Sequence, residues 1–126
     1  MQLAEALSEI RVDLKLRTDT RLREMDFGTW EGVAWNEIPL AAMQTWTDDF
    51  GAHRFGGVES ANEFLARVAK LWDAALEDDY QYQAWITHAG VARAAQLLSQ
   101  DIRSVESASQ WPVAAPGYGQ WLCIDY

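Results

Sequence analysis

Basic residues and cysteine are scarce in this chain of 126 residues. Lysine and arginine number 10 against 19 acidic residues, a formal net charge of −9. No basic stripe is present, which argues against nucleic acid or an anionic membrane surface as a partner. The one cysteine, Cys123, excludes an internal disulfide and suits a reducing compartment. We expect Cys123 to be a small buried hydrophobe within an apolar strand.

Long apolar runs and targeting signals are also lacking. The longest hydrophobic stretches are much shorter than the ~20 residues that cross a bilayer. The first nine residues carry Glu5 and Glu9 and do not resemble a secretory signal. These features predict a cytoplasmic protein without a membrane partner.

Hydrophobic residues are plentiful. They make up 49% of the sequence and include seven tryptophans, enough for a packed core. The length suits one domain of ordinary size, so we expect a single domain over residues 1–126.

Hydrophobic spacing alternates between two periods along the chain. Apolar residues at helical spacing predict helices over residues 3–10, 36–48, 60–79 and 90–100. The third helix is the clearest, because Ser60 and Glu63 form a capping box before it. Alternating or apolar runs predict strands over residues 12–17, 83–87 and 120–126. The predicted fold class is therefore α/β, a three-layer α/β/α sandwich with a mostly parallel sheet, although three strands are few for such a sheet.

A candidate site lies where the second predicted strand meets the fourth helix. The residues there are Thr87, His88, Ala89 and Gly90. Ligands bind outside the carboxyl ends of parallel strands, and a helix N-terminus offers free N–H groups to an anion. A histidine in this position is also often a polar side chain with satisfied hydrogen bonds and no functional role, and this alternative stays open.

Three stretches together resemble the histidine phosphatase superfamily, the phosphoglycerate-mutase-like enzymes. They are residues 22–32 (LREMDFGTWEG), 56–60 (GGVES) and 87–93 (THAGVAR). Their order and spacing are similar to those of the bacterial phosphatase branch that includes α-ribazole phosphatases. The second stretch departs from the family pattern by an inserted Val58, and the third carries Ala89 where the family has glycine.

The resemblance implies hydrolysis of a small phosphomonoester through a phosphohistidine, with no metal or other cofactor. It implies that His88 contacts the phosphoryl group, that the Ala89 N–H lies beside it, and that Glu24 is the general acid. A solvated loop carboxylate is the plainer interpretation of Glu24. Residues Glu31 and Glu59 are expected to fix loops or caps.

One family motif has no counterpart here. The sequence contains no Arg-His-Gly, the motif of the attacking histidine, and its only other histidine is His53. By resemblance we expect a domain that lacks its first central strand and its N-terminal segment, and with them the nucleophile and both phosphate arginines. Such a chain would be inactive alone and would self-associate through exposed sheet edges.

Other functions stay open. One alternative is a non-catalytic module that binds a phosphorylated ligand or self-associates. A phosphoglycerate mutase-type phosphotransferase and an enzyme rebuilt around His88 as nucleophile are the remaining alternatives. Arg93 is equally consistent with a surface and a site role, and Trp30 and Trp35 are expected to anchor loops rather than stack on substrate.

Overall fold

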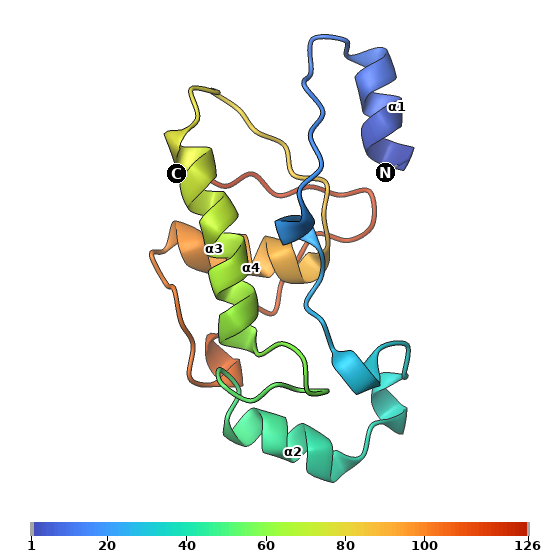
Figure 1. Cartoon of the computed structure of the whole chain (residues 1–126), viewed down its shortest axis with the longest axis vertical. Helices are drawn as coiled ribbons and strands as arrows, with labels where there is room; N and C mark the ends of the chain where they lie inside the picture. Colours follow the sequence, from blue (N-terminus) through green and yellow to red (C-terminus); the bar gives the residue numbers. More distant parts are fainter. Residues whose placement is uncertain (1, 126) are drawn as a thin grey trace.

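The computed structural model describes residues 2–125, and helices are its regular elements. The α-helices are α1 (Gln2–Ile10), α2 (Leu40–Asp48), α3 (Ala61–Glu77) and α4 (Ala89–Ser99) (Figure 1). Short 3₁₀ turns are η1 (Thr20–Leu22), η2 (Gly28–Trp30), η3 (Trp35–Glu37) and η4 (Ala108–Gln110). The four helices expected from periodicity are confirmed, with α2 beginning later because Pro39 is its N-cap. Within the described residues, no helix combines the length and apolar character needed to cross a membrane.

The predicted sheet is wrong. Residues 2–125 contain no strand, so the α/β/α sandwich with a mostly parallel sheet does not form in this structure. The segments 12–17 and 83–87 are not hydrogen-bonded to each other directly; one side chain from each reaches a residue beyond the end of the other. Arg17 Nη2 donates to the Tyr80 hydroxyl (3.0 Å), and Thr87 Oγ1 donates to the Leu22 carbonyl (2.7 Å). No backbone hydrogen bond links the two segments in the described part of the chain.

The reason for this difference is the absence of a neighbour. A strand exists only where another backbone lies about 4.8 Å away to complete the ladder. Alternating apolar side chains also need a covered face, whereas Val12 is 89% exposed and Trp121 is 84% exposed. Cys123 is likewise exposed, contrary to the expected burial. The sheet edges on which the expected self-association rested are therefore not present in residues 2–125.

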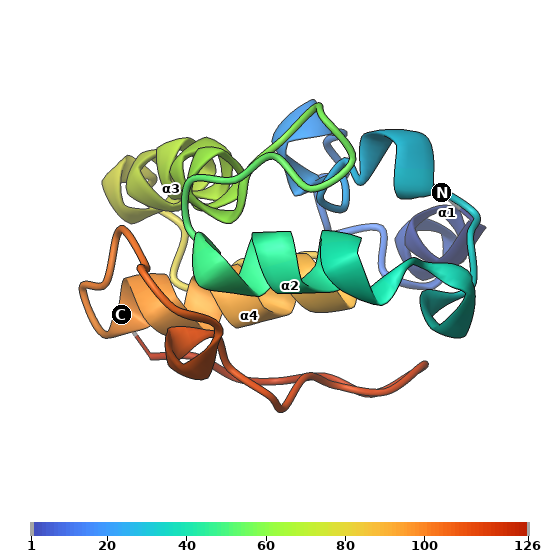
Figure 2. The same cartoon turned by 90° about the horizontal axis from the view of Figure 1, so that it is seen from below.

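The core is formed by α3 against α4. Both helices present an apolar stripe at helical spacing, and these stripes are buried against each other. Phe64, Leu65, Val68 and Val91 are fully buried in this contact. The views in Figures 1 and 2 place α2 beyond the N-terminal end of α3 and α1 at the opposite corner of the molecule.

A group of aromatic rings extends the core towards α2. Phe55 is 1% exposed and stacks on Trp46 with ring centroids 4.3 Å apart. Trp35 stacks on the same two rings, and Phe27 meets all three edge to face. Aromatic pairs in these arrangements add about 0.5–1.5 kcal/mol each beyond the area they bury. The ring group therefore holds the loops before and after α2 against the core.

The N-terminus of α3 carries the expected capping box. The Ser60 side chain accepts from the Glu63 N–H, and Glu63 Oε2 accepts from the Ser60 N–H. Glu63 also forms an ion pair with Arg54. The Arg54 hydrogen bonds, followed by the Ser60 N–H, lower the pKa of Glu63 from 4.5 to about 2.

Replacing Glu63 by Gln should make the free energy of unfolding less dependent on pH in the acid range. The ionised Glu63 is favoured in the folded state, so its contribution is complete above pH 4.5 and is lost as the pH falls towards 2. We expect Glu63→Gln to unfold at lower urea than the wild type at pH 6, with the difference shrinking between pH 4.5 and 2. Glu77→Gln, at the other end of α3, controls for the change in net charge. A difference that stays constant across this pH range would contradict the assignment.

Candidate active site

The three stretches that resemble the family converge in space. Residues 22–32 and 56–60 meet where Gly28 and Gly56, both at positive φ, approach so closely that a Cβ on either would overlap the other loop's backbone. The Thr29 N–H donates to the Gly56 carbonyl across this contact (3.1 Å). Residues 22–32 meet residues 87–93 through the Thr87–Leu22 hydrogen bond.

Glu24 reaches from its loop to the first turn of α4. Its Oε2 accepts from the Gly90 N–H (3.1 Å) and its Oε1 from the Met25 N–H (3.0 Å). A carboxylate is favourable at this place, since the first N–H groups of a helix have no partners within the helix and carry partial positive charge. Gly90 allows the approach because a Cβ there would overlap Glu24 Oε1.

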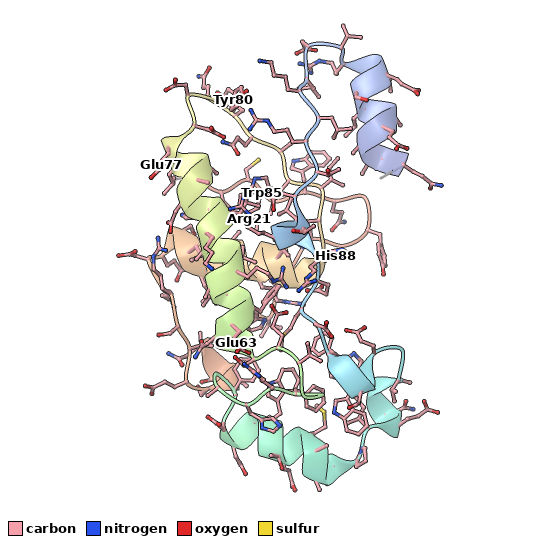
Figure 3. All side chains as sticks on the ribbon, viewed as in Figure 1. Arg21, Glu63, Glu77, Tyr80, Trp85 and His88 are labelled. Carbon is pink, nitrogen blue, oxygen red and sulfur yellow. The ribbon has the colours of Figure 1, made fainter. Side chains whose placement is uncertain are left out.

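His88 is the N-cap of α4 and therefore lies next to this contact in the chain. Figure 3 shows its side chain at the start of α4. Both His88 and Ala89 are exposed. Neither the His88 imidazole nor the Ala89 N–H has a hydrogen-bond partner within residues 2–125. The structure thus brings Glu24, His88 and Ala89 to one end of α4 and leaves two donors open to solvent.

A cavity of about 300 Å³ adjoins Glu24. Glu24, Gly90 and Arg93 form its polar part, and Arg93 also donates to the Val113 carbonyl (3.2 Å). The rest of the wall is apolar and mostly aromatic. It comprises Met25, Phe27, Trp35, Trp46, Phe50, Ala61, Phe64 and Trp111.

Trp35 has two roles in this wall. It anchors its loop by stacking on Trp46 and Phe55, as the sequence suggested, and it also lines the cavity while 57% exposed. The expectation that Glu59 fixes a loop is confirmed, because its Oε2 accepts from the Asp26 N–H (2.9 Å). Arg67, for which the sequence predicted no role, donates to both oxygens of the Glu59 carboxylate.

His53 lies apart from these groups, in the loop after α2, and does not line the cavity. No group of three or more His, Cys, Asp or Glu residues within 2–125 is arranged to hold a metal ion.

A comparison with protein-family models matches residues 1–114 to the histidine phosphatase superfamily (branch 1). The chain belongs to this superfamily. Comparisons with curated proteins and with solved structures give no match. Membership of the histidine phosphatase superfamily supports phosphatase- or mutase-type chemistry in general.

Within this histidine phosphatase domain, Gly90→Ala should move Glu24 without unfolding the protein. The new Cβ overlaps the end of a flexible side chain, while alanine favours a helix by about 1 kcal/mol over glycine. We expect the free energy of unfolding to change by less than about 1 kcal/mol. We also expect the residue-90 amide to lose its protection from hydrogen exchange.

Gly51→Ala is the matched control for this substitution. Its Cβ would overlap the Val105 carbonyl, a backbone group that cannot swing away. It should cost about 1–3 kcal/mol, as overpacking does, and leave the Gly90 amide protected. Unchanged protection at residue 90 in Gly90→Ala would show that Glu24 does not hold this amide.

Proposed function

We propose that this domain binds the phosphoryl group of a small phosphomonoester at the N-terminus of α4 and contributes to its hydrolysis. The observation that carries the proposal is the hydrogen bond of Glu24 on Gly90, directly beside His88 and the free Ala89 N–H. His88 and the Ala89 N–H would donate to the phosphoryl oxygens, and Glu24, in its protonated form, would give a proton to the leaving oxygen.

The attacking group is not among these side chains. The family's Arg-His-Gly motif does not occur in the sequence, and His53 lies in another loop. We therefore assign to this chain the phosphate-binding and proton-donating part of the reaction, and we expect the chain alone to bind phosphomonoesters without turning them over. A small phosphorylated metabolite is the expected ligand.

Titration with inorganic phosphate tests this assignment. We expect the amide resonances of Ala89 and Gly90 to shift in NMR spectra of the wild type. His88→Ala should weaken binding by about tenfold or more, the loss expected for a charge-assisted hydrogen bond. His53→Ala, the only other histidine substitution available, should leave binding unchanged.

Two results would overturn the assignment. Equal weakening by His53→Ala and His88→Ala would mean that binding is not located at α4. His88 would instead be the nucleophile if the wild type turned over p-nitrophenyl phosphate, phosphate were trapped on its His88 imidazole, and His88→Ala lost the turnover.

The cavity supports a finer proposal about the substrate. Its aromatic wall begins at Glu24, so the organic part of a bound phosphomonoester would enter it. Flat aromatic groups stack favourably on such walls, whereas the short, charged chain of a phosphoglycerate would lose its water there with Arg93 alone among the lining residues to offset its charge. This favours an α-ribazole phosphatase-like activity over a phosphoglycerate mutase-type activity.

Competition between two phosphomonoesters tests the substrate class. We expect α-ribazole phosphate to bind at least about tenfold more tightly than 3-phosphoglycerate, as measured by calorimetry, and Trp35→Ala to remove most of that preference. Trp121→Ala, an exposed tryptophan outside the cavity, is the control and should preserve it. Equal affinity for the two ligands in the wild type would contradict an aromatic-binding cavity.

A further inference from the structure

Arg67 has a hydrogen-bond acceptor for every N–H of its guanidinium. Nε donates to Glu59 Oε1 (2.9 Å) and Nη2 to Glu59 Oε2 (3.0 Å), a two-pronged ion pair. The remaining N–H groups donate to main-chain carbonyls, those of Arg21 (2.8 Å), Arg23 (3.0 Å) and Glu24 (3.2 Å). Guanidinium has five N–H groups in a fixed plane, and here all five are used.

The pair is withdrawn from solvent. The side chains of Arg67 and Glu59 are 16% and 11% exposed, and the guanidinium lies over the Phe64 ring at 5.0 Å. The ring beneath and the carboxylate beside it fix the plane of the guanidinium. The N–H groups of the guanidinium that do not bind Glu59 therefore point at the loop that carries Glu24.

The backbone of that loop is held on both sides of Glu24. Arg67 binds the carbonyls of Arg23 and Glu24, and Glu59 binds the next free amide, that of Asp26. Between these points the Glu24 side chain extends to Gly90. The position of the Glu24 carboxylate at α4 thus depends on the hydrogen bonds that Arg67, in the middle of α3, makes to the backbone of this loop.

We propose that Arg67 is a positioning residue, which holds Glu24 against the N-terminus of α4 through the backbone of residues 21–26. The inference rests on the proposed function, in which Glu24 acts at that place. Lysine cannot replace Arg67 in this role. It keeps the charge beside Glu59, but its three N–H groups radiate from one nitrogen and cannot reach two carboxylate oxygens and three carbonyls in one plane.

Hydrogen exchange without ligand tests the positioning directly. The Gly90 N–H lies in the first turn of α4 and its acceptor is Glu24, so its protection reports where that carboxylate is. In Arg67→Lys we expect exchange at Gly90 to accelerate by about tenfold or more, the loss of one net hydrogen bond. Exchange at Leu97, in the core of the same helix, is the internal reference and should change much less.

Arg103→Lys is the matched control, because Arg103 forms a two-pronged but exposed pair with Asp73 of α3, the helix that carries Arg67. It should leave Gly90 unaffected. Should Arg67→Lys fail to fold, Glu59→Asp retracts the carboxylate by one methylene and should loosen Gly90 in the same direction. Equal acceleration at Gly90 and Leu97, or none at Gly90, would overturn the proposal and reduce Arg67 to a general stabiliser.

Phosphate titration of the same variants separates this inference from the proposed function. Arg67 forms no hydrogen bond with His88 or Ala89, and a loosened Glu24 competes less for the N-terminus of α4, so Arg67→Lys should bind inorganic phosphate at least as tightly as the wild type. A wild type that does not bind phosphate would overturn the proposed function while the exchange result at Gly90 still decides the positioning role. Loss of phosphate binding in Arg67→Lys would contradict the separation of the two roles drawn here.

Discussion

The buried pair of Arg67 and Glu59 is the constraint on which the arrangement of the site depends. Packing of apolar stripes sets α3 against α4, but it does not fix the position of the irregular chain that precedes them. The Arg67 guanidinium fixes that position, because its donors bind carbonyls of residues 21–24 in one geometry. A buried ion pair adds little net stability, since desolvation offsets most of the attraction, yet removing one partner costs about 3–5 kcal/mol. Its effect is to select one course of the loop.

Local signals were sufficient for the helices. The capping box at Ser60 and the apolar positions that follow it determine where α3 begins and which face it buries, and both follow from rules that span a few residues. The strands required more than local information. The alternation of Val12, Leu14 and Leu16 indicates which side chains share a face, but it does not indicate whether another backbone lies alongside. In residues 2–125 none does, and the three side chains are exposed.

The residues of the site likewise fall into those that local sequence signals indicate and those that only the folded structure brings together. The sequence indicates His88 directly, because it is a polar residue at the predicted start of a helix. Its closeness to Glu24 could be predicted only from the family resemblance, since 63 residues separate the two in the sequence. The cavity was not predicted, because its rings come from α2, from α3 and from the loops before α2, after α2 and after α4. Arg67 did leave a signal: it is a charged residue between Phe64 and Val68, at the edge of the apolar face, eight positions after an acidic residue that precedes the helix.

The contact of Glu24 with Gly90 has a consequence for ligand selection. The carboxylate is an anion tethered to the protein, and it occupies a helix N–H that would otherwise attract any anion in solution. An intramolecular group competes at an effective concentration that reaches the millimolar range or higher. Weakly bound anions such as chloride or acetate are therefore outcompeted at this N–H. A ligand that takes it must bring enough additional contacts, from its other oxygens or its organic part, to displace the protein's own carboxylate.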